Sequence, residues 1–145
     1  MTRQLALAWL LAALVFLAMD AAWLTLMTPW LYRAEIGALL RERFDLWPAL
    51  LFYLLYVSGI VALAIAPALR LGRARAAGWR GAVLGLVAYG AYDLTNQATL
   101  RGWSWRVTLA DLAWGTVATG LAALAASAAC IAWRRAAARR GRARH

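Results

Sequence analysis

Residues 5–27 read LALAWLLAALVFLAMDAAWLTLM, an apolar run in which Asp20 is the only charged residue. At about 1.5 Å per residue, a helix of this length crosses the ~30 Å of hydrocarbon in a bilayer. A segment surrounded by lipid must be helical, because each backbone polar group needs a partner within the chain. The run is long for a signal peptide, and no small-x-small site closes it cleanly. It therefore predicts a retained first transmembrane helix.

Three further apolar runs follow, at residues 46–69, 81–100 and 107–133. Each is long enough to cross a bilayer as a helix. The sequence therefore predicts an all-α integral membrane protein, a four-transmembrane-helix bundle that forms a single membrane domain over residues 1–145.

The composition agrees with a membrane protein and excludes several other classes. Hydrophobic residues make up 65% of the 145 residues, more than a soluble domain of this size could bury in one core. A single cysteine, Cys130, excludes an internal disulfide and a multi-cysteine metal site. The only histidine is His145, the last residue, so a buried histidine ligand for haem or zinc is not expected. No cofactor is evident.

The net charge of +10 comes from sixteen arginines that lie between and after the apolar runs. This placement is typical of membrane topology, and we expect no nucleic-acid partner. Eleven arginines fall on the side of the termini and five on the other, so both termini are predicted to be cytoplasmic. The basic tail at residues 134–145 is expected to anchor the chain to anionic lipid. The chain is therefore predicted to cross the membrane several times.

The loop between the first two runs has an amphipathic pattern. One helical face would carry Tyr32, Ile36, Leu39, Leu40 and Phe44, and the opposite face Arg41, Glu42 and Asp45. The pattern favours a helix lying on the outer membrane surface. An ordinary ordered loop is the alternative. We expect the three carboxylates of the loop, those of Glu35, Glu42 and Asp45, to be solvated.

The other three carboxylates, those of Asp20, Asp93 and Asp111, fall inside apolar runs. Each costs about 2.5–3.5 kcal/mol in the middle of a bilayer, so such acids usually have a function. With the predicted topology, all three lie roughly 6–10 Å below the outer interface. The sequence therefore predicts an acidic pocket near the outer leaflet.

Each of these acids has polar or aromatic neighbours at helical spacing. DAAW pairs Asp20 with Trp23, and DLAW pairs Asp111 with Trp114, each three residues apart. The stretch AYDLTNQATLRGW, residues 91–103, surrounds Asp93 with amides. The candidate binding residues are Asp20, Trp23, Tyr89, Tyr92, Asp93, Asn96, Gln97, Asp111 and Trp114, and the three aspartates are also the candidate metal ligands.

Structural explanations for the acids compete with the functional one. Thr108 and Asp111 match a capping box at the start of the fourth helix. Asp20 and Asp93 lie near helix C-termini, so they must be protonated, bound to a cation, or paired with an arginine. Arg101 and Arg106 could fold down as counter-ions. Hydrogen bonding between helices is a further explanation.

Small residues predict where the helices approach one another. Gly81 and Gly85 form a G-x-x-x-G pattern in the third run, and Gly115, Thr119 and Gly120 lie in the fourth. Such spacings commonly mark close helix packing.

Several blocks together resemble a known family. They are MDAAWL (19–24), FYLLYVSGIVALAIAPAL (52–69), GAVLGLVAYGAYDLTNQATLRGW (81–103) and TLADLAWGTV (108–117). The chain resembles the bacterial membrane proteins called domain of unknown function 2177. The resemblance implies a small four-helix inner-membrane protein and supplies no activity or substrate. The matching positions are Asp20, Trp23, Tyr92, Asp93, Thr95, Asn96, Thr99, Trp103, Asp111, Trp114 and Gly115; Gln97 departs from the family pattern.

Three classes of function fit these features. The first is a binding or accessory protein whose acidic pocket holds a cation, a lipid headgroup or a membrane partner; carboxylate and amide oxygens suit a divalent cation such as Mg²⁺ or Ca²⁺. The second is a lipid-modifying enzyme with paired carboxylates, although no nucleophile and base are evident. The third is a proton- or cation-coupled small transporter acting as an oligomer. Membrane lipids are expected partners, and a homo-oligomer or a membrane-protein partner remains open.

Overall fold

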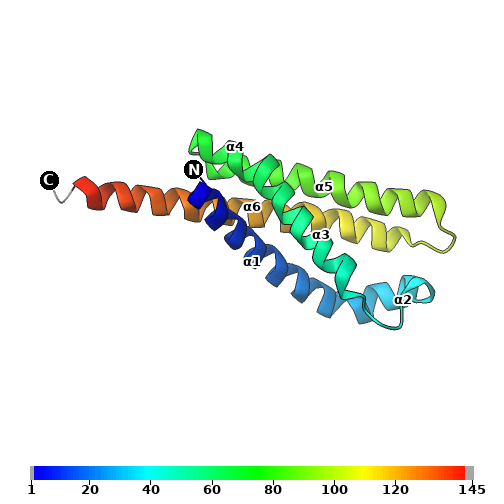
Figure 1. Cartoon of the computed structure of the whole chain (residues 1–145). Coiled ribbons are helices and arrows are strands. Elements are labelled where there is room, and N and C mark those ends of the chain that lie inside the picture. The colour runs from blue at the N-terminus through cyan, green and yellow to red at the C-terminus, as the bar shows by residue number, and fades with distance from the viewer. Residues whose placement is uncertain (1, 143–145) are drawn as a thin grey trace.

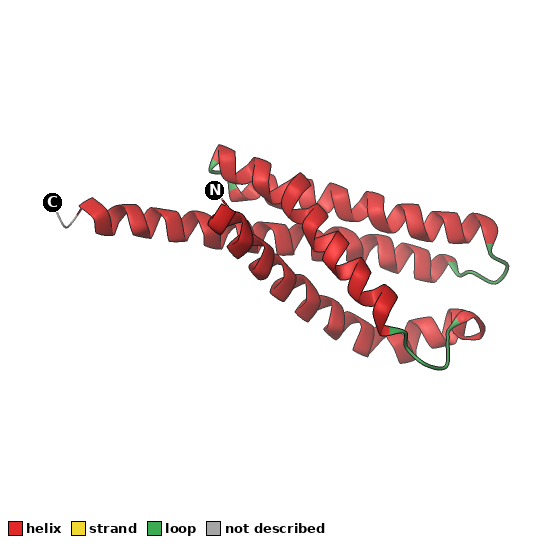
Figure 2. Cartoon of the chain, in the orientation of Figure 1, coloured by secondary structure: helices red, strands yellow, loops and turns green. Residues whose placement is uncertain are grey.

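A computed structural model describes residues 2–142, and every regular element in that range is a helix. Four long helical segments, which we call rods, form the bundle (Figure 1). The first, third and fourth rods are α1 (Thr2–Met27), α5 (Ala74–Thr99) and α6 (Trp105–Arg142). The second rod runs from α3 (Leu46–Gly59) to the end of α4 at Leu71. Figure 2 shows only short connections between them. The predicted all-α class is confirmed, and residues 143–145 of the predicted basic tail lie outside the described range.

Two rods contain a widened turn beside a proline. In η1 (Thr28–Tyr32), which includes Pro29, the N–H of Arg33 donates to the carbonyl of Thr28, five residues back. In the second rod, η3 (Ile60–Ile65) precedes α4 (Ala66–Leu71), where Pro67 lies in the first turn. Proline lacks an N–H and clashes with the carbonyl four residues before it, so a π-type turn is a common accommodation.

Helix ends are set by local side chains and by glycine. Asp45 caps α3, because its carboxylate accepts a hydrogen bond from the N–H of Trp47 at 3.2 Å. The second rod ends at Gly72, whose φ of 64° is the left-handed conformation that glycine adopts without strain. The N–H of Arg73 then reaches back to the carbonyl of Ala68 at 3.2 Å.

The antiparallel pair α5 and α6 has the most extensive contact in the molecule. A Cβ added at Gly85 would lie 2.0 Å from the carbonyl oxygen of Gly115. A Cβ added at Gly81 would lie 2.7 Å from the carbonyl oxygen of Thr119. The two backbones are therefore in direct contact, and the close packing predicted from the G-x-x-x-G pattern is confirmed.

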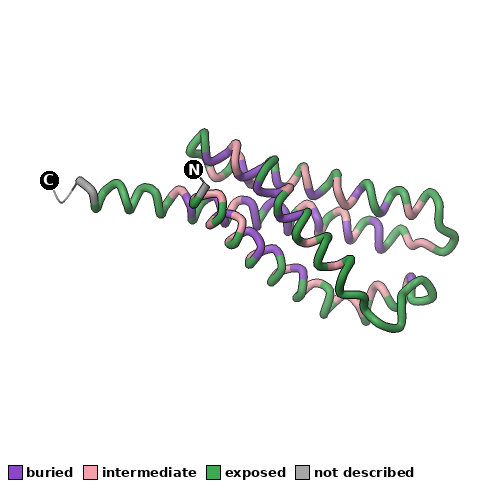
Figure 3. The backbone as a smooth tube through the Cα atoms, in the orientation of Figure 1, coloured by how far each residue is buried: buried purple, intermediate pink, exposed green. Residues whose placement is uncertain are grey.

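The core combines many alanines with a few large side chains such as Phe16 and Ile60, and many leucines face outward. Ala8, Ala12 and Ala64 are fully buried, whereas Leu55 is 77% exposed. Figure 3 shows exposed positions along most of α3. This distribution suits a bilayer, because lipid imposes no penalty on an exposed leucine while small residues let helices approach.

Three stretches are long and apolar enough to cross a membrane: Arg3–Leu39, Leu46–Leu71 and Trp105–Arg140. The helix α5 is not among them, although it runs alongside α6. Arginines at its start and the polar residues around Asp93 lower its hydropathy. The chain is a membrane protein with these three candidate spans, and the fourth crossing remains a prediction.

The first loop differs from a continuous surface helix. The chain is helical in short pieces, through η1, α2 (Arg33–Ile36) and η2 (Gly37–Leu39), and residues 40–45 are irregular. Ile36 is buried, but Leu40 and Phe44 are exposed and lie outside any helix. The extended backbone of Asp45, which its role as a helix cap requires, breaks the expected helical face.

Candidate functional site

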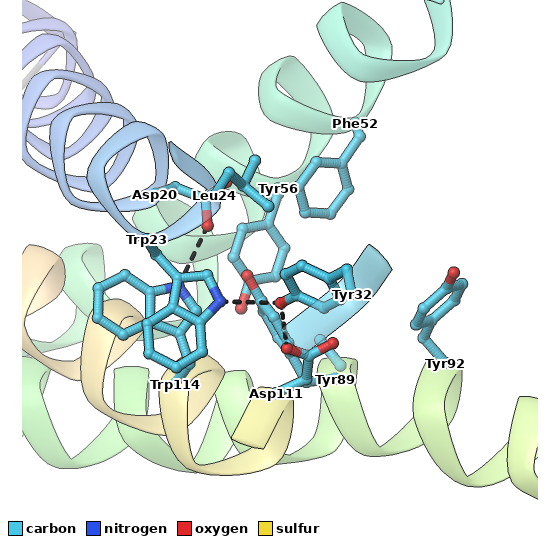
Figure 4. A pocket seen from close by; sticks show the side chains of 11 residues that line it. Asp20, Trp23, Leu24, Tyr32, Phe52, Tyr56, Tyr89, Tyr92, Asp111 and Trp114 are labelled. Atoms are coloured by element: carbon cyan, nitrogen blue, oxygen red, sulfur yellow. Dashed lines mark hydrogen bonds between the residues drawn. The ribbon is translucent and has the colours of Figure 1, made fainter. Parts of the chain in front are cut away.

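A cavity of about 460 Å³ lies near the end of the bundle that carries residues 28–45 and 100–104, which we call the loop end. Seven aromatic rings and two carboxylates line it, and nine of its residues are polar or aromatic (Figure 4). The aromatic residues are Trp23 and Tyr32 from α1 and η1, Phe52 and Tyr56 from α3, Tyr89 and Tyr92 from α5, and Trp114 from α6.

Asp20 holds three helices together at this cavity. One carboxylate oxygen accepts a hydrogen bond from the hydroxyl of Tyr53 at 2.5 Å. The other accepts one from the indole N–H of Trp114 at 3.1 Å. The buried carboxylate of α1 is therefore bonded to α3 and to α6.

Asp111 accepts a hydrogen bond from the hydroxyl of Tyr32. The oxygen of that hydroxyl in turn accepts the indole N–H of Trp23 at 2.8 Å. The π-type turn η1 carries Tyr32 back toward α6, so that a residue of the first loop becomes part of the site.

The two D-x-A-W motifs interlock. The rings of Trp23 and Trp114 stack at a centroid distance of 4.5 Å and an interplanar angle of 7°. Each indole serves the acid of the other motif: Trp114 bonds Asp20 directly, and Trp23 reaches Asp111 through Tyr32. Each tryptophan lines the same cavity as its own aspartate, as their shared helical face predicts, but its indole N–H extends away from its helix and donates toward the other motif.

Asp93 lies apart from the other two acids. Its side chain is 0% exposed, neither carboxylate oxygen has a hydrogen-bond partner, and it does not line the cavity. The register that sets Gly85 against Gly115 brings Asp93 to the level of the buried Val107 on α6. A step of about 100° from Tyr92 turns it from the cavity toward the helix contact. Two acids therefore meet, and the third is buried elsewhere.

The amides predicted for the site do not line the cavity either. Gln97 accepts a hydrogen bond from the hydroxyl of Thr108 at 3.1 Å and donates to the carbonyl of Trp103 at 3.4 Å. The indole N–H of Trp103 donates to the same threonine oxygen at 3.1 Å. Gln97 thus holds the α5–α6 connection in place, and Asn96 is half-buried outside the cavity lining.

The capping box proposed for Asp111 is incorrect. Helix α6 starts at Trp105, and Ser104 caps it by accepting the N–H of Arg106 at 3.1 Å. Thr108 lies within the helix and donates to Gln97 instead. Asp111 is in the second turn, so the start of the helix does not explain it.

The arginines of the short connection do not reach the cavity acids. Arg106 forms an ion pair with Glu35 at 2.7 Å, and Ser104 donates to the same carboxylate at 2.6 Å. Glu35 was expected to be solvated, yet it ties the first loop to the start of α6. Within residues 2–142, the other ion pair joins Arg41 and Asp45, so neither Asp20 nor Asp111 has an arginine partner there.

Four aromatic residues of the site were missed by the sequence reasoning: Tyr32, Phe52, Tyr53 and Tyr56. The hydroxyl-bearing rings in FYLLY, residues 52–56, were a usable signal, because a buried tyrosine hydroxyl needs a partner. Tyr56 finds one in the hydroxyl of Thr119 at 2.8 Å, at the floor of the cavity.

The lining suits a positive charge. Aromatic faces attract cations, and two acids add negative charge. The lining contains no serine, cysteine, histidine or lysine that could act as a nucleophile or base beside the acids. Over the described part of the chain, no group of three histidine, cysteine or acidic residues could hold a metal ion.

Comparison with known proteins agrees with the membrane character. The model of a family described as a predicted membrane protein, DUF2177, matches residues 5–128. No curated protein and no solved structure matches the chain. Since the matched residues span most of the chain, it belongs to the DUF2177 family of predicted membrane proteins.

Proposed function

We propose that this protein is a small binding protein of the bacterial inner membrane that holds an organic ammonium group in its aromatic cavity. The observation that carries the proposal is the pair of buried acids, Asp20 and Asp111, inside a cavity walled by aromatic rings and without an arginine partner among the described residues. Aromatic cages with nearby carboxylates are a recurring way to bind ammonium ions.

The charge balance supports this ligand. The groups that donate to Asp20 and Asp111 are tyrosine hydroxyls and an indole N–H, which are neutral. An ionised carboxylate in this position is therefore not neutralised by its hydrogen bonds. A buried charge without a counter-charge is destabilising, and an ammonium ion in the cavity would supply that counter-charge.

The membrane placement follows from the arginine distribution. We propose four transmembrane helices with both termini in the cytoplasm, which puts the loop end and its cavity near the outer leaflet. The antiparallel contact of α5 with α6 supports the fourth crossing, because α5 packs alongside a helix that is itself a candidate span.

The ammonium ligand is favoured over a divalent cation. Hard cations prefer six or more oxygen ligands in a compact shell. The cavity offers two carboxylates, three of whose four oxygens already accept hydrogen bonds, and Asp93 is not part of the lining.

Binding is also favoured over transport and lipid modification. Below the cavity, the hydroxyl of Tyr56 bonds to Thr119, and the helices beyond meet through Ala8, Ala12 and Ala64. A continuous polar route across the bundle would have to pass this packed apolar core. For lipid modification, the lining offers only carboxylates and tyrosine hydroxyls as acids, bases or nucleophiles, and both Asp20 and Asp111 already accept hydrogen bonds.

The test is isothermal titration calorimetry, which measures the affinity of the purified protein in lipid nanodiscs for tetramethylammonium and for dodecyltrimethylammonium. Asp20→Asn and Asp111→Asn should each weaken binding at least about tenfold, because one counter-charge is removed. Glu42→Gln removes the same charge from an exposed position and should leave the affinity unchanged. Equal affinity in all four proteins would refute the proposed function.

A further inference from the structure

The cavity has one side made of exposed apolar and aromatic residues. Phe52 is 43% exposed and Tyr92 is 60% exposed, whereas Asp20 and Asp111 are buried. In Figure 4, Tyr92 stands apart from the rings that surround the two carboxylates, and Phe52 lies on the outer side of Tyr56, on which it stacks at 5.2 Å. We call the opening between these two residues the lateral mouth.

The lateral mouth results from the angle between the second rod and α5. Helix α5 packs along η3 and α4, while α3 packs on α1. Figure 1 shows α3 diverging from α5 toward the loop end. The side chains of α3 and α5 therefore line the cavity without closing it on this side.

The surroundings of the lateral mouth are apolar. Leu51 and Leu55 on α3 and Val87 on α5 are all more than half exposed. In a membrane protein, such positions face acyl chains. The mouth therefore opens sideways toward hydrocarbon.

The loop end covers the cavity from the other direction. Tyr32 inserts from η1 and bonds to Asp111, and the Glu35–Arg106 ion pair fastens the same loop to the start of α6. A ligand from water would have to displace this cover, whereas a ligand from the bilayer would pass between Phe52 and Tyr92.

We infer that the natural occupant is a membrane-resident amphiphile, whose ammonium headgroup lies between Asp20 and Asp111 while its chain leaves through the lateral mouth into the bilayer. This inference rests on the proposed function and adds the source of the ligand. The shared chemistry is an organic ammonium, and the competing source is a free ammonium compound from water.

The experiment compares two probes with the same headgroup. Tetramethylammonium has no long chain, and dodecyltrimethylammonium has one; both are titrated into protein in phosphatidylglycerol nanodiscs, a lipid without an ammonium group, with empty nanodiscs subtracted. We expect dodecyltrimethylammonium to bind at least tenfold more tightly, because the chain holds it in the bilayer beside the mouth.

Variants of the mouth separate a specific route from simple partitioning. Phe52→Ala and Tyr92→Ala should weaken binding of dodecyltrimethylammonium at least threefold more than they weaken binding of tetramethylammonium, because both rings line the cavity as well as its mouth. Leu63→Ala is the matched control, since Leu63 lies in η3 of the same rod, is 60% exposed, and does not line the cavity.

The outcomes distinguish the two levels of the argument. If both probes bind with equal affinity and depend on Asp20, but the mouth variants have no effect, the lipid source is wrong and the proposed function stands. If binding of either probe is insensitive to Asp20→Asn and Asp111→Asn, the proposed function fails and the inference fails with it.

Discussion

Replacing Gly85 with alanine should separate α5 from α6. The added Cβ would lie 2.0 Å from the carbonyl oxygen of Gly115 and 2.8 Å from the side-chain oxygen of Thr119. Ordinary contact begins near 3.4 Å, so one backbone must retreat by about 1.4 Å at this point. No side-chain rotation relieves the clash, because the opposing atom belongs to the backbone.

The cost should lie at the upper end of what overpacking causes. Extra methyl groups in a packed core typically cost about 1–3 kcal/mol, and we expect at least about 2 kcal/mol for Gly85→Ala. Gly115→Ala should behave similarly, because its Cβ would lie 2.3 Å from the ring of Tyr89. The assay is unfolding by sodium dodecyl sulfate in mixed micelles, followed by far-ultraviolet circular dichroism.

Gly59→Ala is the matched control for the same chemical change. Gly59 is the last residue of α3, and an added Cβ there would meet nothing within 4 Å. The substitution should be neutral or stabilise by up to about 1 kcal/mol through helix propensity. If Gly85→Ala and Gly59→Ala unfold at the same detergent fraction, α5 and α6 do not pack at the distance described.

Three further substitutions test other parts of the structure. Asp93→Leu removes a buried carboxylate that has no hydrogen bonds, and should raise the free energy of unfolding by about 1–3 kcal/mol in the same detergent titration. A lower free energy of unfolding would mean that Asp93 has a partner in the membrane. Trp114→Phe keeps an aromatic ring stacked on Trp23 but removes the hydrogen bond to Asp20, and should lower the free energy of unfolding by about 1 kcal/mol. Tyr53 donates to the same carboxylate, so a double-mutant cycle of Trp114→Phe with Tyr53→Phe should show coupling. Strictly additive losses in the double mutant would contradict the shared carboxylate. Arg106→Gln should lower the free energy of unfolding by about 0.5–1 kcal/mol, because its partner Glu35 is only 21% exposed. Arg41→Gln should lower it by less, because its partner Asp45 is 41% exposed. Equal effects would show that the contact of Arg106 with Glu35 is as weak as a surface ion pair.

The helices could be predicted because bilayer thickness dictates the length of an apolar run. The predicted span of 46–69 corresponds to a rod from Leu46 to Leu71, and the span of 5–27 ends where α1 ends. The glycine contact of α5 with α6 could also be predicted, because only small residues at a spacing of four permit it. These features depend on local spacing, which the sequence states directly.

The site was less predictable, because it depends on which residues different helices bring together. Depth alone placed Asp20, Asp93 and Asp111 at one level, but depth does not say which way a side chain faces around its helix. Tyr32 was assigned to a surface helix, since nothing in the sequence indicates that a widened turn at Pro29 carries it inward. Thr108 fits a capping pattern, but Ser104 was the earlier residue able to cap α6.

The exchange of partners between the two D-x-A-W motifs has a consequence for how this protein can vary. Each motif needs the tryptophan of the other for its hydrogen bonds, although Asp20 and Asp111 are 91 positions apart in the sequence. A change of Trp114 alone leaves Asp20 with only the hydroxyl of Tyr53 as a donor, and a change of Trp23 alone leaves the stack without one of its rings. Substitutions in one motif should therefore be tolerated mainly when the other changes with it, so that the pair is inherited as a single unit.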